Sequence, residues 1–222
     1  MTDDGSAADP GTGIGTGIGA VILAAGSGTR LGGRPKCLLE LNGRSLIRRQ
    51  ISALQSLGLS DIVVVLGHHH KVIGDELRQL NVDWVKQPAS EHSQSSSIRL
   101  GIARLPRLLT GYLVCPSDLP LLAREDYAAV IQAFRSRSPE HAFVGPEVDG
   151  TPGHPVIFDD RLLGPLESGS TGLGSGQWRN EAGSGMLRWQ TSNINFTFDI
   201  DTEDDIHALE QSTGHRLTWP TA

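Results

Sequence analysis

Cysteine is scarce in this 222-residue chain, which has only Cys37 and Cys115, far apart and without a CxxC pair. That supply is too small for a disulfide framework or a cysteine-based zinc site, so we expect reduced thiols in a cytoplasmic protein. No apolar run approaches the roughly 20 residues that cross a bilayer. Residues 1–10 also lack the basic start and apolar stretch of a secretory signal, and we expect no membrane partner.

Positive charge is also limited, because 19 Lys and Arg residues face 25 Asp and Glu residues, for a formal net charge of -6. Proteins that coat nucleic acid usually carry a basic surface, so we expect no nucleic-acid partner. Glycine is abundant, with 27 residues. The length suits one α/β domain with a substantial core.

The N-terminal glycines lie in the repeat GTGIGTGIG. Residues 1–18 contain few large side chains to bury, so a disordered glycine-rich tail is predicted, followed by a single domain over residues 19–222. A GxGxxA match spans residues 15–20. In a dinucleotide-binding unit this pattern follows a strand, whereas here it precedes one, which disfavours that function.

Apolar runs and helical periodicity alternate along the rest of the chain. Strands are predicted over residues 20–24, 61–67, 82–86, 112–115, 142–145, 155–158 and 194–200. Helices are predicted over residues 45–57, 71–80, 95–105, 126–137 and 203–211, and a mobile loop over residues 168–176. This alternation predicts a Rossmann-like, three-layer α/β/α fold around a mostly parallel sheet.

A glycine-rich loop, LAAGSGTRLGGRPK, follows the first predicted strand and spans Leu23 to Lys36. Ligands of parallel sheets bind beyond the carboxyl ends of the strands, where this loop begins. Its glycines let backbone amides approach phosphate oxygens, and Arg30 and Lys36 add positive charge. The loop is not a P-loop, because Arg34 stands where that motif has Lys followed by Ser or Thr. The alternative is a flexible loop with solvated cations.

Carboxylates follow two other predicted strands. Asp118, in CPSDLPLL, would face the glycine loop and suits a magnesium ion, although a turn or helix-cap aspartate fits as well. Asp199 and Asp201 would share one side of the predicted strand 194–200. The acidic residues that follow Thr202 have a structural explanation, because they suit a helix N-terminus.

Two further segments carry polar side chains. Ser95, Ser96 and Ser97 stand at a predicted helix start, where hydroxyl and amide donors could bind a ligand, although capping needs only one serine. The run His68 to His70 follows a strand, and a surface loop explains it better than a metal site.

The segment LAAGSGTRLGGRPKCLLELNGRSLI resembles the signature of the nucleotidyltransferase superfamily. Within it the chain is similar to the MobA-like group, nearest to molybdenum cofactor cytidylyltransferases. The resemblance implies a fold of the nucleotide-diphospho-sugar transferase type and a loop that wraps a triphosphate. It also implies catalytic roles for Arg30, Lys36 and Asp118, and a Mg²⁺ ion on Asp118 with Asp199 or Asp201, of which Asp199 is preferred.

The same resemblance implies the substrate contacts. The nucleotide-binding residues would be Leu23, Ala24, Ala25, Gly26, Gly28, Arg30, Lys36, Gly67, Ser96 and Ser97. Ala25 is the form found in cytidylyl-transferring members, and His154, in a Gly-His-Pro element, would lie on the acceptor side. A turn histidine remains the alternative there. The acceptor side also departs from the family pattern at residues 151–153 and 181–186.

The expected function is therefore Mg²⁺-dependent transfer of CMP from CTP to a small phosphorylated acceptor. The resemblance points to molybdopterin as acceptor and to a molybdoenzyme as client protein. Sugar or alditol phosphates are the alternative acceptors. A non-catalytic nucleotide sensor or cofactor chaperone on the same fold is the alternative function.

Overall fold

A computed structural model describes residues 13–91, 93–169 and 185–220, and their centre is an eight-stranded sheet. Seven strands run in the order β10-β7-β9-β6-β1-β4-β5, and β8 pairs with β7. The strands are β1 (Ile18–Ala24), β4 (Ile62–Leu66), β5 (Asp83–Lys86), β6 (Gly111–Pro116), β7 (Phe143–Val148), β8 (Thr151–Pro152), β9 (Val156–Phe158) and β10 (Met186–Gln190). The sheet is mostly parallel, since every antiparallel pair among these strands involves β8 or β9. The predicted fold class is confirmed.

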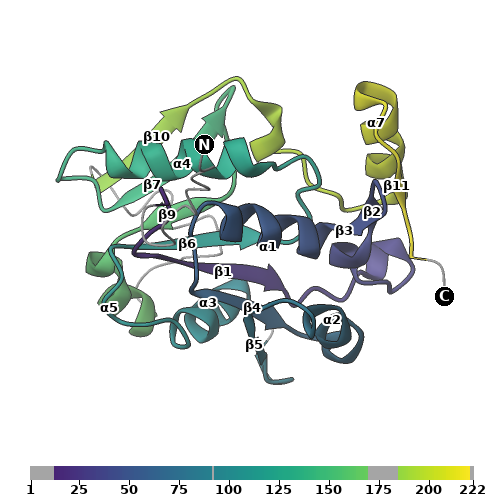
Figure 1. The fold of residues 1–222 in the computed structure, drawn as a ribbon, viewed down its shortest axis with the longest axis horizontal. Coiled ribbons are helices and arrows are strands. Elements are labelled where there is room, and N and C mark those ends of the chain that lie inside the picture. Colours follow the sequence, from purple (N-terminus) through teal and green to yellow (C-terminus); the bar gives the residue numbers. More distant parts are fainter. Residues whose placement is uncertain (1–12, 92, 170–184, 221–222) are drawn as a thin grey trace, which may run out of the picture.

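Helices cover both faces of the sheet (Figure 1). They are α1 (Leu46–Ser56), α2 (His70–Leu77), α3 (Gln94–Ile102), α4 (Arg124–Arg135), α5 (Leu163–Glu167) and α7 (Glu203–Thr213). Apolar residues of α1, α2 and α4 pack with one set of strand side chains, and those of α3 and α5 pack with the alternate set. In β1, for example, Ile22 belongs to the first core and Val21 to the second, as the two-residue period of a strand requires.

A smaller sheet lies at one end of the molecule, in the order β11-β2-β3. Its strands are β2 (Glu40–Leu41), β3 (Arg44–Ser45) and β11 (Leu217–Thr218), so the end of the chain pairs with a hairpin near its beginning. A third core joins this sheet to α7 and to the glycine loop through Leu31, Ile200 and Leu209. The packed side chains of this core therefore hold the glycine loop in place.

Three expectations differ from the structure. The segment predicted as a strand over 194–200 forms a 3-10 turn over Ile194–Phe196 and then an irregular stretch, because Asn193 caps the turn and accepts a hydrogen bond from Asn195 N. β10, which was not predicted, pairs with β7 and forms the edge of the sheet there. Residues 13–18 are ordered, with Gly15 N donating to Leu57 O at 2.8 Å, whereas residues 1–12 lie outside the described range.

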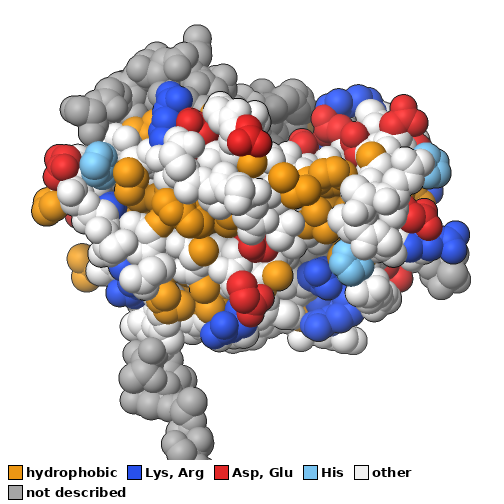
Figure 2. Space-filling view, turned by 90° about the horizontal axis from the view of Figure 1, so that it is seen from above, with side chains coloured by type: hydrophobic (Ala, Val, Ile, Leu, Met, Phe, Trp, Pro, Cys, Tyr) orange, Lys and Arg blue, Asp and Glu red, His pale blue; other side chains and the backbone are white. Residues whose placement is uncertain are grey.

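Side chains of both charges share the outer surface. On the face drawn in Figure 2, both Lys and Arg side chains and Asp and Glu side chains of the described residues are scattered around a band of hydrophobic side chains. Within the described ranges, no helix is both long and apolar enough to cross a bilayer. The loop predicted over 168–176 falls almost entirely on residues that the structure does not describe.

Candidate active site

The site lies where β1, β4 and β6 end. Leu23 of β1 pairs with Pro116 of β6, and Ala24 pairs with Leu66 of β4, so the three strands finish side by side. Because parallel strands place their carboxyl ends at one edge, the loops after them meet there. The glycine loop, the Asp118 segment and the Gly67 turn leave this edge together.

The glycine loop is folded tightly back on itself. The carbonyl of Gly28 accepts hydrogen bonds from Leu31 N at 2.9 Å and from Gly33 N at 3.0 Å. Gly28 has a φ of 65°, and a Cβ atom at this position would lie 1.9 Å from Arg34 O. Only glycine fits there, so this residue fixes the turn that presents Arg30 and Lys36.

Lys36 and Arg30 contact the carboxylates that the sequence singled out. Lys36 Nζ lies 3.4 Å from Asp118 Oδ2 and also donates to Asp201 Oδ1. Arg30 Nη1 lies 2.7 Å from Asp201 Oδ2. The predicted cations and the predicted carboxylates therefore form one cluster.

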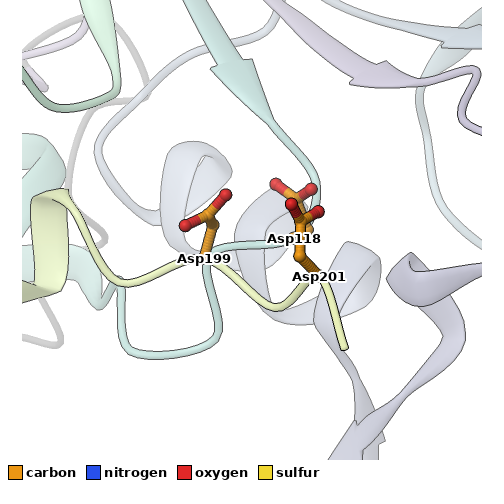
Figure 3. Close-up of side chains that lie close together, drawn as sticks. All are labelled: Asp118, Asp199 and Asp201. Carbon is orange, nitrogen blue, oxygen red and sulfur yellow. The ribbon is translucent and has the colours of Figure 1, made fainter. Parts of the chain in front are cut away.

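Figure 3 shows the three carboxylates together, Asp118 after β6, and Asp199 and Asp201 on one irregular segment. One oxygen from each lies within 4.8 Å of the others. The two segments are joined directly, because Ile200 N donates to Asp118 O at 2.9 Å. Asp199 is exposed, and no described residue donates to its carboxylate, so it is the member without a cation partner.

Two of these carboxylates have pKa values shifted in opposite directions. Burial raises the pKa of Asp118, Lys36 opposes the rise and the charge of Asp199 adds to it. The hydrogen bond from Lys36 lowers the pKa of Asp201, which is less buried, and Arg30 lowers it further. The surroundings of Asp118 therefore disfavour its charged form, and a bound cation would favour it.

The donor set suits a divalent metal. All three candidate ligands are carboxylates, and Mg²⁺ and Mn²⁺ prefer such hard oxygen atoms. Arg30 and Lys36 are two cations against three carboxylates, so negative charge remains for a metal ion to offset. The residues therefore fit the metal that the sequence predicts.

A cavity of about 750 Å³ opens beside the carboxylates, between the glycine loop and the start of α3. Its lining includes several predicted site residues, namely Leu23, Ala25, Gly26, Gly67, Ser97 and Asp118. A Cβ atom on Gly67 would lie 2.3 Å from Ala25 O, so glycine is needed where the two loops meet. His69 ties the same loops together, since its Nε2 lies 2.9 Å from Ser27 O.

The other predicted nucleotide-binding residues are not among those that line the cavity, namely Ala24, Gly28, Arg30, Lys36 and Ser96. The Ser96 hydroxyl accepts from Gln87 Nε2 at 2.8 Å, and the same Nε2 donates to Ser93 O at 3.2 Å. Gln87 does line the cavity, and sequence reasoning missed it. The capping serine of α3 is Ser93 rather than any of Ser95 to Ser97.

His154 lies beside the same edge, because β9 runs antiparallel to β6 and Val156 pairs with Val114. Its backbone N donates to Phe196 O at 2.8 Å, which attaches the segment before β9 to the segment that carries Asp199. His154 is not among the residues that line the cavity, so its place on the acceptor side stays a prediction. The departures predicted at 181–184 lie outside the described residues.

Comparison with known proteins identifies the family to which this chain belongs. The model of the MobA-like NTP transferase domain matches residues 20–183. The bifunctional protein GlmU of Mycobacterium ulcerans is 36% identical over 128 residues, which cover 53% of this chain and 25% of that protein. The chain spans only a quarter to a third of the length of the curated relatives first matched.

Solved structures share the fold. Rv0371c from Mycobacterium tuberculosis H37Rv has a TM-score of 0.74 at 22% identity, over 88% of this chain and 98% of that one. A complex of Rv0371c with manganese has a TM-score of 0.68 at 22% identity, over 88% and 99% of the two chains. The 4-diphosphocytidyl-2C-methyl-D-erythritol synthase of Anaerococcus prevotii has a TM-score of 0.67 at 18% identity, over 86% and 93%.

Proposed function

The chain belongs to the family of MobA-like NTP transferase domains and is a nucleotidyltransferase, and we propose that it transfers CMP from CTP to a small phosphorylated acceptor. Molybdopterin is the first candidate acceptor, with a molybdoenzyme as the client that receives the product. Sugar and alditol phosphates are the next candidates. Mg²⁺ is the proposed metal.

The observation that carries this proposal is the cluster around Lys36. An ammonium and a guanidinium contact two of three clustered carboxylates, and one of these, Asp118, lines a cavity large enough for a nucleotide. A triphosphate needs cations for its oxygens, and its metal needs carboxylates. Cations for the phosphates and carboxylates for the metal thus lie side by side. Neither a purely structural ion pair nor a simple nucleotide pocket explains this combination.

Two residues of the cavity lining, Gln87 and Ala25, bear on the choice of donor. Gln87 donates both Nε2 hydrogens to Ser93 and Ser96, which leaves its Oε1 as an acceptor. The exocyclic amino group of cytosine is a matching donor, as are those of adenine and guanine, so this acceptor disfavours UTP, and the choice of CTP rests on the family resemblance. Ala25, on the opposite loop, is the residue found in the cytidylyl-transferring relatives that this chain resembles.

The chemistry follows from positioning and charge. A phosphate oxygen of the acceptor attacks the α-phosphorus in line, and the bond to the bridging oxygen breaks so that pyrophosphate leaves. Lys36 and Arg30 would move their hydrogen bonds from Asp118 and Asp201 to the phosphates and offset the developing charge. Asp118 and Asp199 would hold the metal, which when bound neutralises phosphate charge.

Before the triphosphate binds, Asp201 would keep the two cations oriented through its ion pairs with them, and its own backbone is held by Asp205. Asp205 Oδ2 accepts from Asp201 N at 2.8 Å and from Thr202 N at 2.7 Å, within a capping box of α7. Although burial opposes it, these hydrogen bonds lower the pKa of Asp205. The carboxylate therefore stays charged and keeps the turn fixed.

The test is pyrophosphate release with Mg²⁺, each of CTP, GTP, ATP and UTP, and molybdopterin or a sugar phosphate as acceptor. We expect release with CTP and molybdopterin, and none from the Asp118→Ala variant, which should remain folded. Thermal shift with the four nucleotides reports donor choice without an acceptor. A preference for another nucleotide would refute CTP, and equal turnover by Asp118→Ala would refute the site.

A further inference from the structure

Asp126, near the start of α4, is a carboxylate that the proposed mechanism does not use. Its side chain is nine-tenths buried, at 7% exposure of the residue. Oδ1 accepts from Asn193 Nδ2 at 2.6 Å, and Oδ2 accepts from Asn195 Nδ2 at 3.1 Å and from Ala123 N at 2.8 Å. We name the three side chains of Asp126, Asn193 and Asn195 the asparagine clasp.

The clasp joins the two segments that carry the metal-site carboxylates. Asp126 follows Asp118 by eight residues on one segment, and Asn195 precedes Asp199 by four residues on the other. A second junction lies at the far end, where Ile200 N donates to Asp118 O at 2.9 Å. The two segments are thus fastened to each other on both sides of Asp199.

The position of Asp199 depends on these junctions, because no described residue forms a hydrogen bond with its carboxylate. It is exposed, and no described residue donates to it, whereas Asp201 has Lys36 and Arg30. Phe196, three residues before Asp199, is buried and accepts from His154 N at 2.8 Å, and Ile200, directly after Asp199, is buried, so the backbone on either side is anchored. The position of Asp199 relative to Asp118 is then set by the backbone path between the clasp and Ile200.

We propose that Asp126, Asn193 and Asn195 are positioning residues for the metal, which fix the separation of Asp199 from Asp118. This inference rests on the proposed role of those two aspartates. Breaking the clasp lets the segment before Asp199 move away from α4, and the carboxylate pair loses its set distance. Groups that orient metal ligands from outside typically change metal affinity 10-fold to 100-fold when replaced.

Asn193→Asp breaks the clasp with a nearly isosteric change. The new carboxylate cannot donate to Asp126, but it can still accept from Asn195 N, which Asn193 Oδ1 does at 3.1 Å. Adding Asp126→Asn restores a donor opposite the new carboxylate, and the remaining oxygen at position 126 can still serve Ala123 N and Asn195. The double variant therefore exchanges the two partners and tests the hydrogen bond itself.

The matched control is Asp159→Asn, which also removes a buried carboxylate with several partners. Asp159 is 6% exposed and accepts from Arg137 Nη2 at 2.9 Å and Arg161 Nη2 at 2.6 Å. It follows β9 after Phe158, which pairs with Tyr112 at the amino end of β6. It therefore lies at the opposite edge of the sheet and should cost stability without affecting the metal.

The experiment measures Mn²⁺ affinity of the full chain without nucleotide, from free Mn²⁺ in electron paramagnetic resonance spectra, together with Tm. We expect Asn193→Asp to weaken Mn²⁺ binding about 10-fold, the double variant to restore it, and Asp159→Asn to leave it unchanged despite a lower Tm. Unchanged affinity in Asn193→Asp, or equal weakening in Asp159→Asn, overturns the inference. If Asp118→Ala binds Mn²⁺ like wild type, the proposed metal site itself fails, and the clasp proposal fails with it.

Discussion

Asp118→Asn should raise the stability of the ligand-free protein while it abolishes turnover. The change keeps the size of the side chain and its ability to accept from Lys36, and it removes one of three clustered negative charges. Burial and the charge of Asp199 raise the pKa of Asp118, so the folded state disfavours the charged form. The wild-type charge therefore costs folding free energy at any pH above that raised pKa.

The size of the gain follows from the distances. Asp118 lies 3.4 Å from Lys36 Nζ and within 4.8 Å of oxygens from Asp199 and Asp201. With an effective dielectric constant of about 20, each repulsion amounts to about 3.5 kcal/mol and the attraction to about 5 kcal/mol, which leaves about 2 kcal/mol of net repulsion. Solvent screens part of it, so we expect Tm to rise by about 2–6 °C.

Differential scanning fluorimetry in EDTA at pH 7.5 measures this gain, and pyrophosphate release measures turnover, which should fall at least about 100-fold. The gain should shrink as the pH falls and Asp118 takes up its proton. Asp75→Asn is the control, because Asp75 is exposed and pairs only with Arg78 among the described residues, so its Tm should barely change. A lower Tm for Asp118→Asn in EDTA at pH 7.5, or turnover near that of wild type, would refute the reasoning.

Three further changes probe the same structure. Lys36→Met should lower kcat/KM for the triphosphate at least about 100-fold, measured by pyrophosphate release well below Tm; a drop in Tm with full activity would make Lys36 a structural residue only. Asp201→Asn should lower Tm at pH 7, because the Lys36 hydrogen bond lowers the pKa of Asp201. The charged carboxylate therefore stabilises the fold above the ordinary pKa of an aspartate, and this stabilisation is lost as the pH falls through the lowered pKa. A Tm difference between variant and wild type that persists at pH 2 would contradict this. Burial raises the pKa of Cys37 and of Cys115 to about 12, so mass spectrometry should find neither alkylated by iodoacetamide at pH 8 in the folded protein, and rapid alkylation would show that the core opens.

Much of the site could be predicted because many of its residues lie close together in the sequence. The glycine loop carries its cations and its turn residues within 14 positions, from Leu23 to Lys36, and the structure places both cations on the predicted carboxylates. Asp118 follows a buried strand directly, so the parallel sheet alone brings it to the loop. Strand ends were predictable because continuous apolar runs mark buried parallel strands.

The parts that sequence reasoning missed depend on contacts between distant residues. Alternating apolar residues over 194–200 favour a strand, but Asn193 and Asn195 bind Asp126 instead, and this draws the backbone into a turn. Gln87 becomes a cavity residue only through Ser93 and Ser96, which fold against it. A side chain whose partner stands far along the chain leaves no local pattern to detect.

The pairing of β11 with β2 has a consequence for biosynthesis. Leu217 lies opposite Leu41, so the hairpin beneath the glycine loop leaves the ribosome about 175 residues before its third strand. At typical elongation rates of 5–20 residues per second, this delay is about 10–35 s. Throughout that interval the nascent chain holds an incomplete support for Arg30 and Lys36, and the loop that carries these two proposed phosphate-binding side chains matures only after β11 has been made.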